Sequence, residues 1–129
     1  MGKRRSNPEQ LLQIAVADYL RLALRSPTIW TAFPAGGGGR VRGAFLKAMG
    51  LQAGWPDILV IDVLRFDTRV FGIELKSAKG RSSPAQEATW KAFVGVGAFY
   101  DICRSVDEVE TFLRDLQVPL YASVTGIKC

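Results

Sequence analysis

Two acidic residues and one lysine stand at spacings that could build a metal-dependent hydrolytic site. Asp57 follows Gly54-Trp55-Pro56 and directly precedes an apolar, β-branched run, whereas Glu74 and Lys76 lie near the end of a second run. Because side chains alternate between the two faces of a strand, Glu74 and Lys76 share one face. Two carboxylates and an ammonium form a hard, oxygen-rich site, which suits Mg2+ or Mn2+ better than zinc.

The chain contains no histidine. Its absence excludes imidazole-activated serine or cysteine nucleophiles, zinc sites with a histidine ligand, and imidazole proton shuttles. The two cysteines, Cys103 and Cys129, are too few for a structural zinc site and are typical of a reduced cytosolic protein. Catalysis by this chain therefore has to use carboxylates, lysine, hydroxyls or an oxygen-bound metal.

The positive charge is concentrated in the first half of the chain. The 129 residues have a formal net charge of +5; residues 1–50 hold eight basic and two acidic side chains, and the remainder holds nine and ten. This asymmetry favours a polyanion such as nucleic acid as partner, although a moderately basic surface can also be merely solvated. The candidates for contacts to the DNA backbone are Arg40, Arg42, Lys47, Lys79 and Arg81.

The first 50 residues predict one helix and one short strand before a glycine-rich stretch. A helix is expected from residue 8 to about 24, because Asn7 suits an N-cap, Pro8 suits the first helical position and apolar residues then recur at helical spacing. Residues 29–33 favour a strand. Residues 36–43, four glycines followed by Arg-Val-Arg-Gly, predict a loop or a backbone surface for close ligand approach. Residues 44–49 allow one or two helical turns.

The centre of the chain predicts an antiparallel hairpin. Residues 58–63 suit a strand buried on both faces, residues 69–75 alternate between apolar and polar side chains, and 64–68 link them. In this pairing the start of the first strand lies opposite the end of the second, so we expect Asp57 near Glu74 and Lys76. A capped helix over 83–94, a strand over 99–103 and a helix over 106–116 follow.

Neither a membrane-spanning nor a secretory segment is apparent. No apolar run approaches the roughly 18 residues that a transmembrane helix needs. The basic residues 3–5 are followed by Ser-Asn-Pro and not by an apolar stretch. We therefore expect a protein without membrane association that works in the cytoplasm.

Four blocks of the sequence together resemble a known family. They are Gly54-Trp55-Pro56-Asp57, Ile73-Glu74-Leu75-Lys76, the stretch from Lys79 to Gln86, and Gly97-Ala98-Phe99-Tyr100. In this order and spacing they resemble the VRR-NUC (virus-type replication-repair nuclease) branch of the PD-(D/E)XK nucleases. The resemblance covers roughly residues 8–113 and is closest to the small stand-alone phage and prophage type.

The resemblance implies an α+β fold of the restriction-endonuclease type, with an αβββαβ core and a mixed central sheet flanked by helices. It also implies metal ligands at Asp57, at Glu74 and at the backbone carbonyl of Leu75. Lys76 matches the motif lysine, and Gln86 matches a polar residue that the following helix contributes, although Gln86 could equally serve only a capping box. Glu9 matches an acidic residue that many members carry on the first helix, facing the metal.

We therefore expect a single domain over residues 1–129 that acts as a Mg2+- or Mn2+-dependent DNA endonuclease. It would hydrolyse phosphodiester bonds with a preference for branched or junction DNA, in phage replication or repair. The alternatives are a nucleic-acid-binding module that does not cut and a phage interaction protein with an incidental basic face. Paired cleavage of a junction would require a homodimer. The extension over 117–129 could supply its interface or pack on its own domain.

Overall fold

The computed structural model describes residues 7–33 and 39–124. The basic residues 3–5, most of the glycine tract and Cys129 therefore lie outside the described residues. The elements follow the order α1 (Pro8–Ala23), β1 (Ile29–Ala32), α2 (Gly39–Ala48), β2 (Ile58–Leu64), β3 (Asp67–Leu75), α3 (Pro84–Gly95), β4 (Phe99–Cys103) and α4 (Val106–Asp115).

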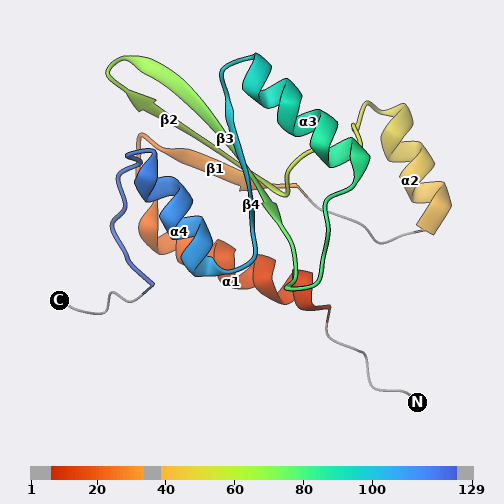
Figure 1. Cartoon of the computed structure of the whole chain (residues 1–129), viewed down its shortest axis with the longest axis horizontal. Helices are drawn as coiled ribbons and strands as arrows, with labels where there is room; N and C mark the ends of the chain where they lie inside the picture. Colours follow the sequence, from red (N-terminus) through yellow and green to blue (C-terminus); the bar gives the residue numbers. More distant parts are fainter. Residues whose placement is uncertain (1–6, 34–38, 125–129) are drawn as a thin grey trace.

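The four strands form one mixed sheet in the order β1-β2-β3-β4. β1 and β3 both pair antiparallel with β2, whereas β4 pairs parallel with β3. The parallel pairing requires a crossover, which α3 provides. The predicted α+β fold, with a mixed sheet flanked by helices, is confirmed (Figure 1).

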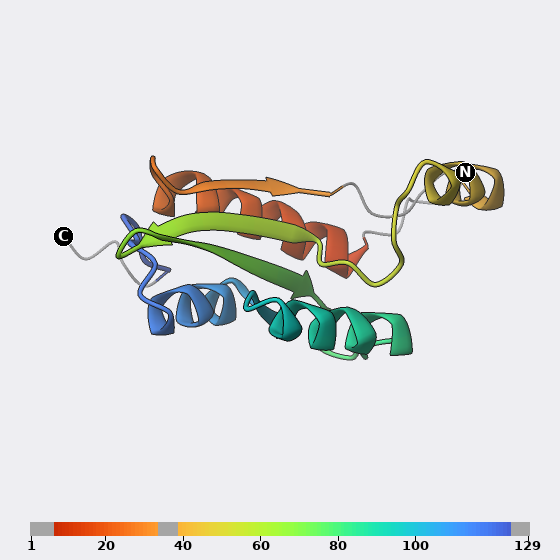
Figure 2. The same cartoon turned by 90° about the horizontal axis from the view of Figure 1, so that it is seen from above.

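The sheet has two unlike faces. α1 and α4 cover one face, where Leu20, Val60, Phe71, Ile73 and Leu113 belong to a single buried cluster. α3 lies on the other face and leaves much of β1 and β2 without a helix above them, as Figure 2 shows from above. The β2 and β3 side chains that alternate toward α1 and α4 therefore form the core, as period-two strands require.

The structure corrects the prediction for residues 39–49. Arg40 to Gly43 were expected in a loop, but they lie within α2, which runs from Gly39 to Ala48. Apart from Gly39 and Gly43, most residues of α2, such as Arg40 and Leu46, have good intrinsic helix propensity, and this outweighs the glycine signal. α2 projects beyond the end of the sheet at which β2 begins (Figures 1 and 2).

The described part of the C-terminal extension packs on its own domain. Val118 joins the buried cluster, and Leu120 and Ala122 pack against it. The Tyr121 backbone N–H donates to the carbonyl of Ala23 at the end of α1 over 2.8 Å. Cys103 is buried and unpaired, as expected for a small core residue. None of the helices described has the length and apolar character that crossing a bilayer demands.

Candidate active site

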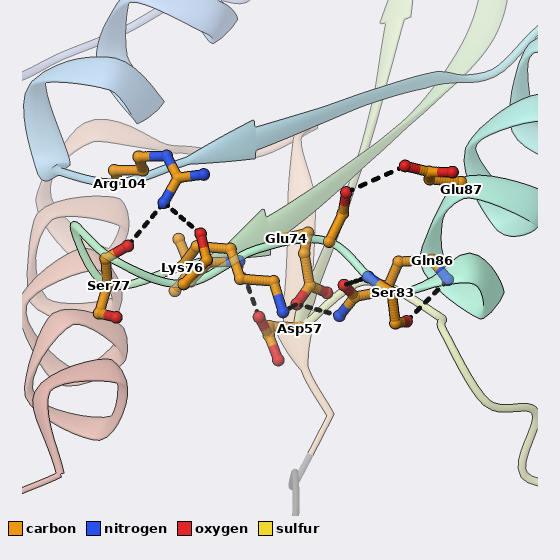
Figure 3. A network of polar contacts seen from close by, with 11 residues as sticks. Asp57, Glu74, Lys76, Ser77, Ser83, Gln86, Glu87 and Arg104 are labelled. Carbon is orange, nitrogen blue, oxygen red and sulfur yellow. Dashed lines mark hydrogen bonds and ion pairs between the residues drawn. The ribbon is translucent and has the colours of Figure 1, made fainter.

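The strand register brings the two predicted acids together. Ile58 pairs with Ile73, so Asp57 lies opposite Glu74 at one end of the β2-β3 hairpin. Asp57 Oδ2 accepts a hydrogen bond from the Leu75 backbone N–H over 2.7 Å. The Lys76 side chain turns back toward Glu74, and its Nζ lies 3.6 Å from Glu74 Oε2 (Figure 3). The sequence pattern predicted that Asp57 would lie near Glu74 and Lys76, and the structure has this arrangement.

Two glycines allow the chain to hold Asp57 in this place. Gly54 has a φ of +83°, and a Cβ there would lie 2.4 Å from the Ala85 backbone, so the loop before Asp57 can rest directly on α3. A Cβ on Gly72 would lie 2.8 Å from Pro56. Pro56 is buried against the sheet at that point, and it fixes the direction in which the chain enters β2.

Gln86 combines the two roles that the sequence left open. Its Oε1 accepts a hydrogen bond from the Ser83 backbone N–H over 2.9 Å, which completes the capping box of α3. Its Nε2 donates to Glu74 Oε2 over 2.8 Å. The cap therefore orients the amide whose other end holds the Glu74 carboxylate (Figure 3).

Burial and mutual repulsion disfavour the charged forms of the two acids. The pKa of Glu74 is raised to about 7, first by burial and then by the nearby charge of Asp57, with Lys76 acting in the opposite direction. The pKa of Asp57 is also raised, mainly by burial, although the hydrogen bond from Leu75 opposes this. Lys76 alone therefore does not offset the negative charge of Asp57 and Glu74.

The residues present fit a hard divalent cation. Glu74 Oε1 is buried and has no hydrogen-bond partner, so one carboxylate oxygen is free to bind a ligand. The N–H and C=O of one strand residue point to the same side, which places the Leu75 carbonyl on the side of Asp57. Among the described residues, no three or more Asp, Glu, Cys or His side chains form a ready metal cluster.

Glu9 lies at the margin of this pair. Its Oε1 would be 3.2 Å from a Cβ added to Gly80, and the same Cβ would be 3.3 Å from Lys76 Cδ, so both side chains border Gly80. The charge of Glu9 contributes to raising the pKa of Asp57. Glu9 is thus near the acids, and its role as a metal ligand stays a prediction.

The predicted DNA contacts lie on two segments at this end of the molecule. Arg40, Arg42 and Lys47 are exposed on α2, and Lys79 and Arg81 are exposed on the loop between β3 and α3. Both segments lie at the end of the sheet where β2 begins and β3 ends (Figure 1). Their cations therefore place positive charge at the end that carries Asp57 and Glu74.

One residue that holds this loop was missed by the sequence analysis. Arg104 directly follows β4, and its Nη1 donates to the carbonyls of Ser77 and Gly80, over 2.7 Å in each case (Figure 3). These bonds fix the backbone around Lys79. No sequence pattern marks Arg104, because its contact depends on the parallel pairing of β4 with β3.

Comparisons with known proteins support the same fold. Neither a family model nor a curated protein matches the sequence. A solved structure described as "VRR_NUC domain protein" superposes with a TM-score of 0.66 and 19% identity, covering 86% of this chain and 88% of the other. A second, described as "VRR_NUC domain", gives a TM-score of 0.54 and 19% identity, covering 88% and 100%. Over most of its length, the chain therefore has the fold of the VRR_NUC domain.

Proposed function

We propose that this protein is a VRR-NUC nuclease that hydrolyses phosphodiester bonds in DNA with the help of Mg2+ or Mn2+. The observation that carries the proposal is the buried pair of Asp57 and Glu74, which retains an unpartnered carboxylate oxygen. The pair stands beside a lysine, in a fold shared with VRR_NUC domains. A binding module that does not cut has no need to bury two acids next to each other.

The protein contributes the metal ligands and fixes their orientation. Asp57, Glu74 and the Leu75 carbonyl would hold the cation, with Glu9 as a candidate fourth group. Gln86 holds Glu74 through its Oε2, and the Leu75 N–H holds Asp57. When bound, the metal lowers the pKa of water and offsets negative charge on the phosphate.

Lys76 and the basic segments act on the DNA. The Lys76 ammonium lies among the acids on a side chain that is only 12% exposed, so its position is well defined. There it can orient the attacking water or stabilise the charge that develops on the phosphate. The exposed cations of α2 and of the loop that Arg104 holds would contact the DNA backbone and place the scissile bond without reading sequence.

A cleavage assay tests the proposal. Purified protein is incubated with linear, nicked, flapped and four-way-junction DNA in Mg2+, in Mn2+ and in EDTA. We expect cleavage with either metal, strongest on branched DNA, and its loss in EDTA. Asp57→Asn should reduce the cleavage rate by roughly 10³-fold or more, because it removes a ligand charge with almost no change in shape.

A matched control is available on the same hairpin. Asp67→Asn changes an exposed acid at the opposite end of β3 and should leave cleavage unchanged. Activity that persists in EDTA and in the Asp57 variant would overturn the proposal. DNA retention without cleavage in either metal would instead support the nucleic-acid-binding module that does not cut. Absence of DNA retention at low salt would support a phage interaction protein whose basic face is incidental.

A further inference from the structure

Two buried polar atoms near the Asp57–Glu74 pair have no hydrogen-bond partner. They are Glu74 Oε1 and the hydroxyl of Tyr100, and within the described residues no other buried side-chain nitrogen or oxygen lacks a partner. Tyr100 is only 6% exposed, so bulk water does not satisfy its hydroxyl. Buried hydroxyls and carboxylates in native proteins are nearly always paired, which means that this coincidence requires an explanation.

The strand register places both side chains on one face of the sheet. In the parallel pairing of β3 with β4, Tyr100 is the partner of Gly72, and Ile102 is the partner of Glu74. Gly72 and Glu74 are two residues apart, so they share a face, and Tyr100 is the diagonal neighbour of Glu74 on that face. In agreement with this, the charges of Glu74 and Asp57 add to burial in raising the pKa of Tyr100.

Aromatic rings fix the direction of the Tyr100 side chain. Its ring stacks on Trp90, with centroids 6.3 Å apart, and meets Phe93 edge to face at 5.5 Å. Both aromatic partners belong to α3, the helix that also carries Gln86. The Tyr100 ring is therefore packed against the same helix that, through Gln86, holds the other oxygen of Glu74.

We propose that Tyr100 is a positioning residue for Glu74, with its hydroxyl as the hydrogen-bond donor to Oε1. Gln86 would then hold Oε2 and Tyr100 would hold Oε1, so the carboxylate plane could not rotate. A carboxylate oxygen has two lone pairs, and Oε1 can accept this bond while it binds a metal. The effect of Tyr100 on cleavage rests on the proposed nuclease function, whereas the hydrogen bond between Tyr100 and Glu74 does not depend on it.

The test is the variant Tyr100→Phe, which removes only the hydroxyl. Its matched control is Tyr121→Phe, a half-exposed tyrosine that contacts Arg25 at the other end of α1. Mn2+ affinity is measured by calorimetry, and kcat and KM are measured on junction DNA. We expect Tyr100→Phe to weaken Mn2+ binding about tenfold and to lower kcat by a similar factor with KM unchanged, as loss of an outer hydrogen bond to a metal ligand does. The control should change neither quantity.

A double-mutant cycle on the melting temperature of the metal-free protein tests the contact without any activity. If the hydroxyl holds Glu74, Tyr100→Phe lowers the melting temperature in the wild-type background and has a clearly smaller effect in Glu74→Ala, which has no acceptor at that position. If the hydroxyl has no partner, its removal leaves the melting temperature unchanged or raises it in both backgrounds, and the proposal is overturned. A protein that cuts no DNA but shows the coupling refutes the proposed function and retains the inference.

Discussion

The two ends of the β2-β3 hairpin carry acids of similar burial in opposite states of pairing. At one end Asp62 pairs with Arg69, with side chains 1% and 12% exposed; at the other, Glu74 faces Lys76, with side chains 5% and 12% exposed. Arg69 holds both oxygens of Asp62, over 2.8 and 2.6 Å, and also bonds the carbonyl of Leu116. Lys76 reaches Glu74 at only 3.6 Å.

The difference separates a pair that maintains the fold from one that is prepared for a ligand. The Asp62 carboxylate is matched by a planar, bidentate guanidinium, the arrangement best suited to a buried ion pair. Glu74 lies beside a second acid, Asp57, and keeps one oxygen unpartnered. Both ends carry a buried acid next to a basic residue of similar exposure. They differ in whether the basic residue pairs with both carboxylate oxygens, and this difference separates the structural pair Asp62–Arg69 from the candidate site at Glu74.

The largest stability effect should come from breaking the satisfied pair. Arg69→Met leaves the Asp62 charge buried without a partner, which typically lowers the free energy of unfolding by about 3–5 kcal/mol. Lys76→Met should lower it by only about 1 kcal/mol or less at pH 7, because Glu74, with a pKa of about 7, can take up a proton. Urea denaturation of both variants measures the contrast.

The exposed ion pair of α1 provides the control for this contrast. Arg21 and Asp18 lie 2.9 Å apart with most of both side chains in water, so Arg21→Met should change the free energy of unfolding by less than about 1 kcal/mol. Equal losses for Arg69→Met and Lys76→Met would mean that the two ends of the hairpin do not differ in the way proposed.

A smaller effect should appear in the pH dependence of the metal-free protein. The pKa of Glu74 is about 7 in the fold, above its ordinary value of 4.5, so the folded state binds the proton more tightly than the unfolded state. The resulting stabilisation is fully present below pH 4.5 and is lost as the pH rises through 7, with a slope of at most about 1.4 kcal/mol per pH unit for one proton. Urea midpoints in EDTA between pH 5 and 8 measure it.

The absence of histidine makes this pH window unusually clean. No imidazole titrates between pH 5 and 8 in this chain, so no histidine obscures the contribution of the carboxylates to the slope. Glu74→Gln should flatten the dependence, whereas Asp67→Asn should leave it as in the wild type. A midpoint that rises with pH over this range would contradict the raised pKa of Glu74.

The sequence was sufficient for the parts of the site that depend on local periodicity. The alternation of residues 69–75 and the apolar run of 58–63 define a register in which Asp57 lies opposite Glu74, and the structure has that register. The cap at Ser83 is equally local and correctly places Gln86 at the start of α3. Short-range pattern and hairpin geometry together determine these contacts.

The parts that were not predicted depend on pairing between distant segments. Tyr100 and Arg104 acquire their positions from the parallel register of β4 on β3, which no turn fixes. Asp62 reads in the sequence only as an interruption of an apolar strand, and its pairing with Arg69 emerges from the register of the hairpin. The first part of α2, over 39–43, was missed because glycines were given more weight than the helix formers around them, whereas helical turns over 44–49 were predicted.

The smallest expected effect concerns the exposed cations of α2. Replacing Arg40 and Arg42 together by Ala removes two candidate phosphate contacts, so the slope of log affinity against log salt should decrease in magnitude by about 2 for duplex DNA. As a control, Arg21→Ala combined with Arg25→Ala removes the same net charge from the last turn of α1 and the segment after it, away from Asp57 and Glu74. That control should leave the slope nearly unchanged. Equal slopes for the two double variants would remove α2 from the DNA interface, because net charge alone would then explain the binding.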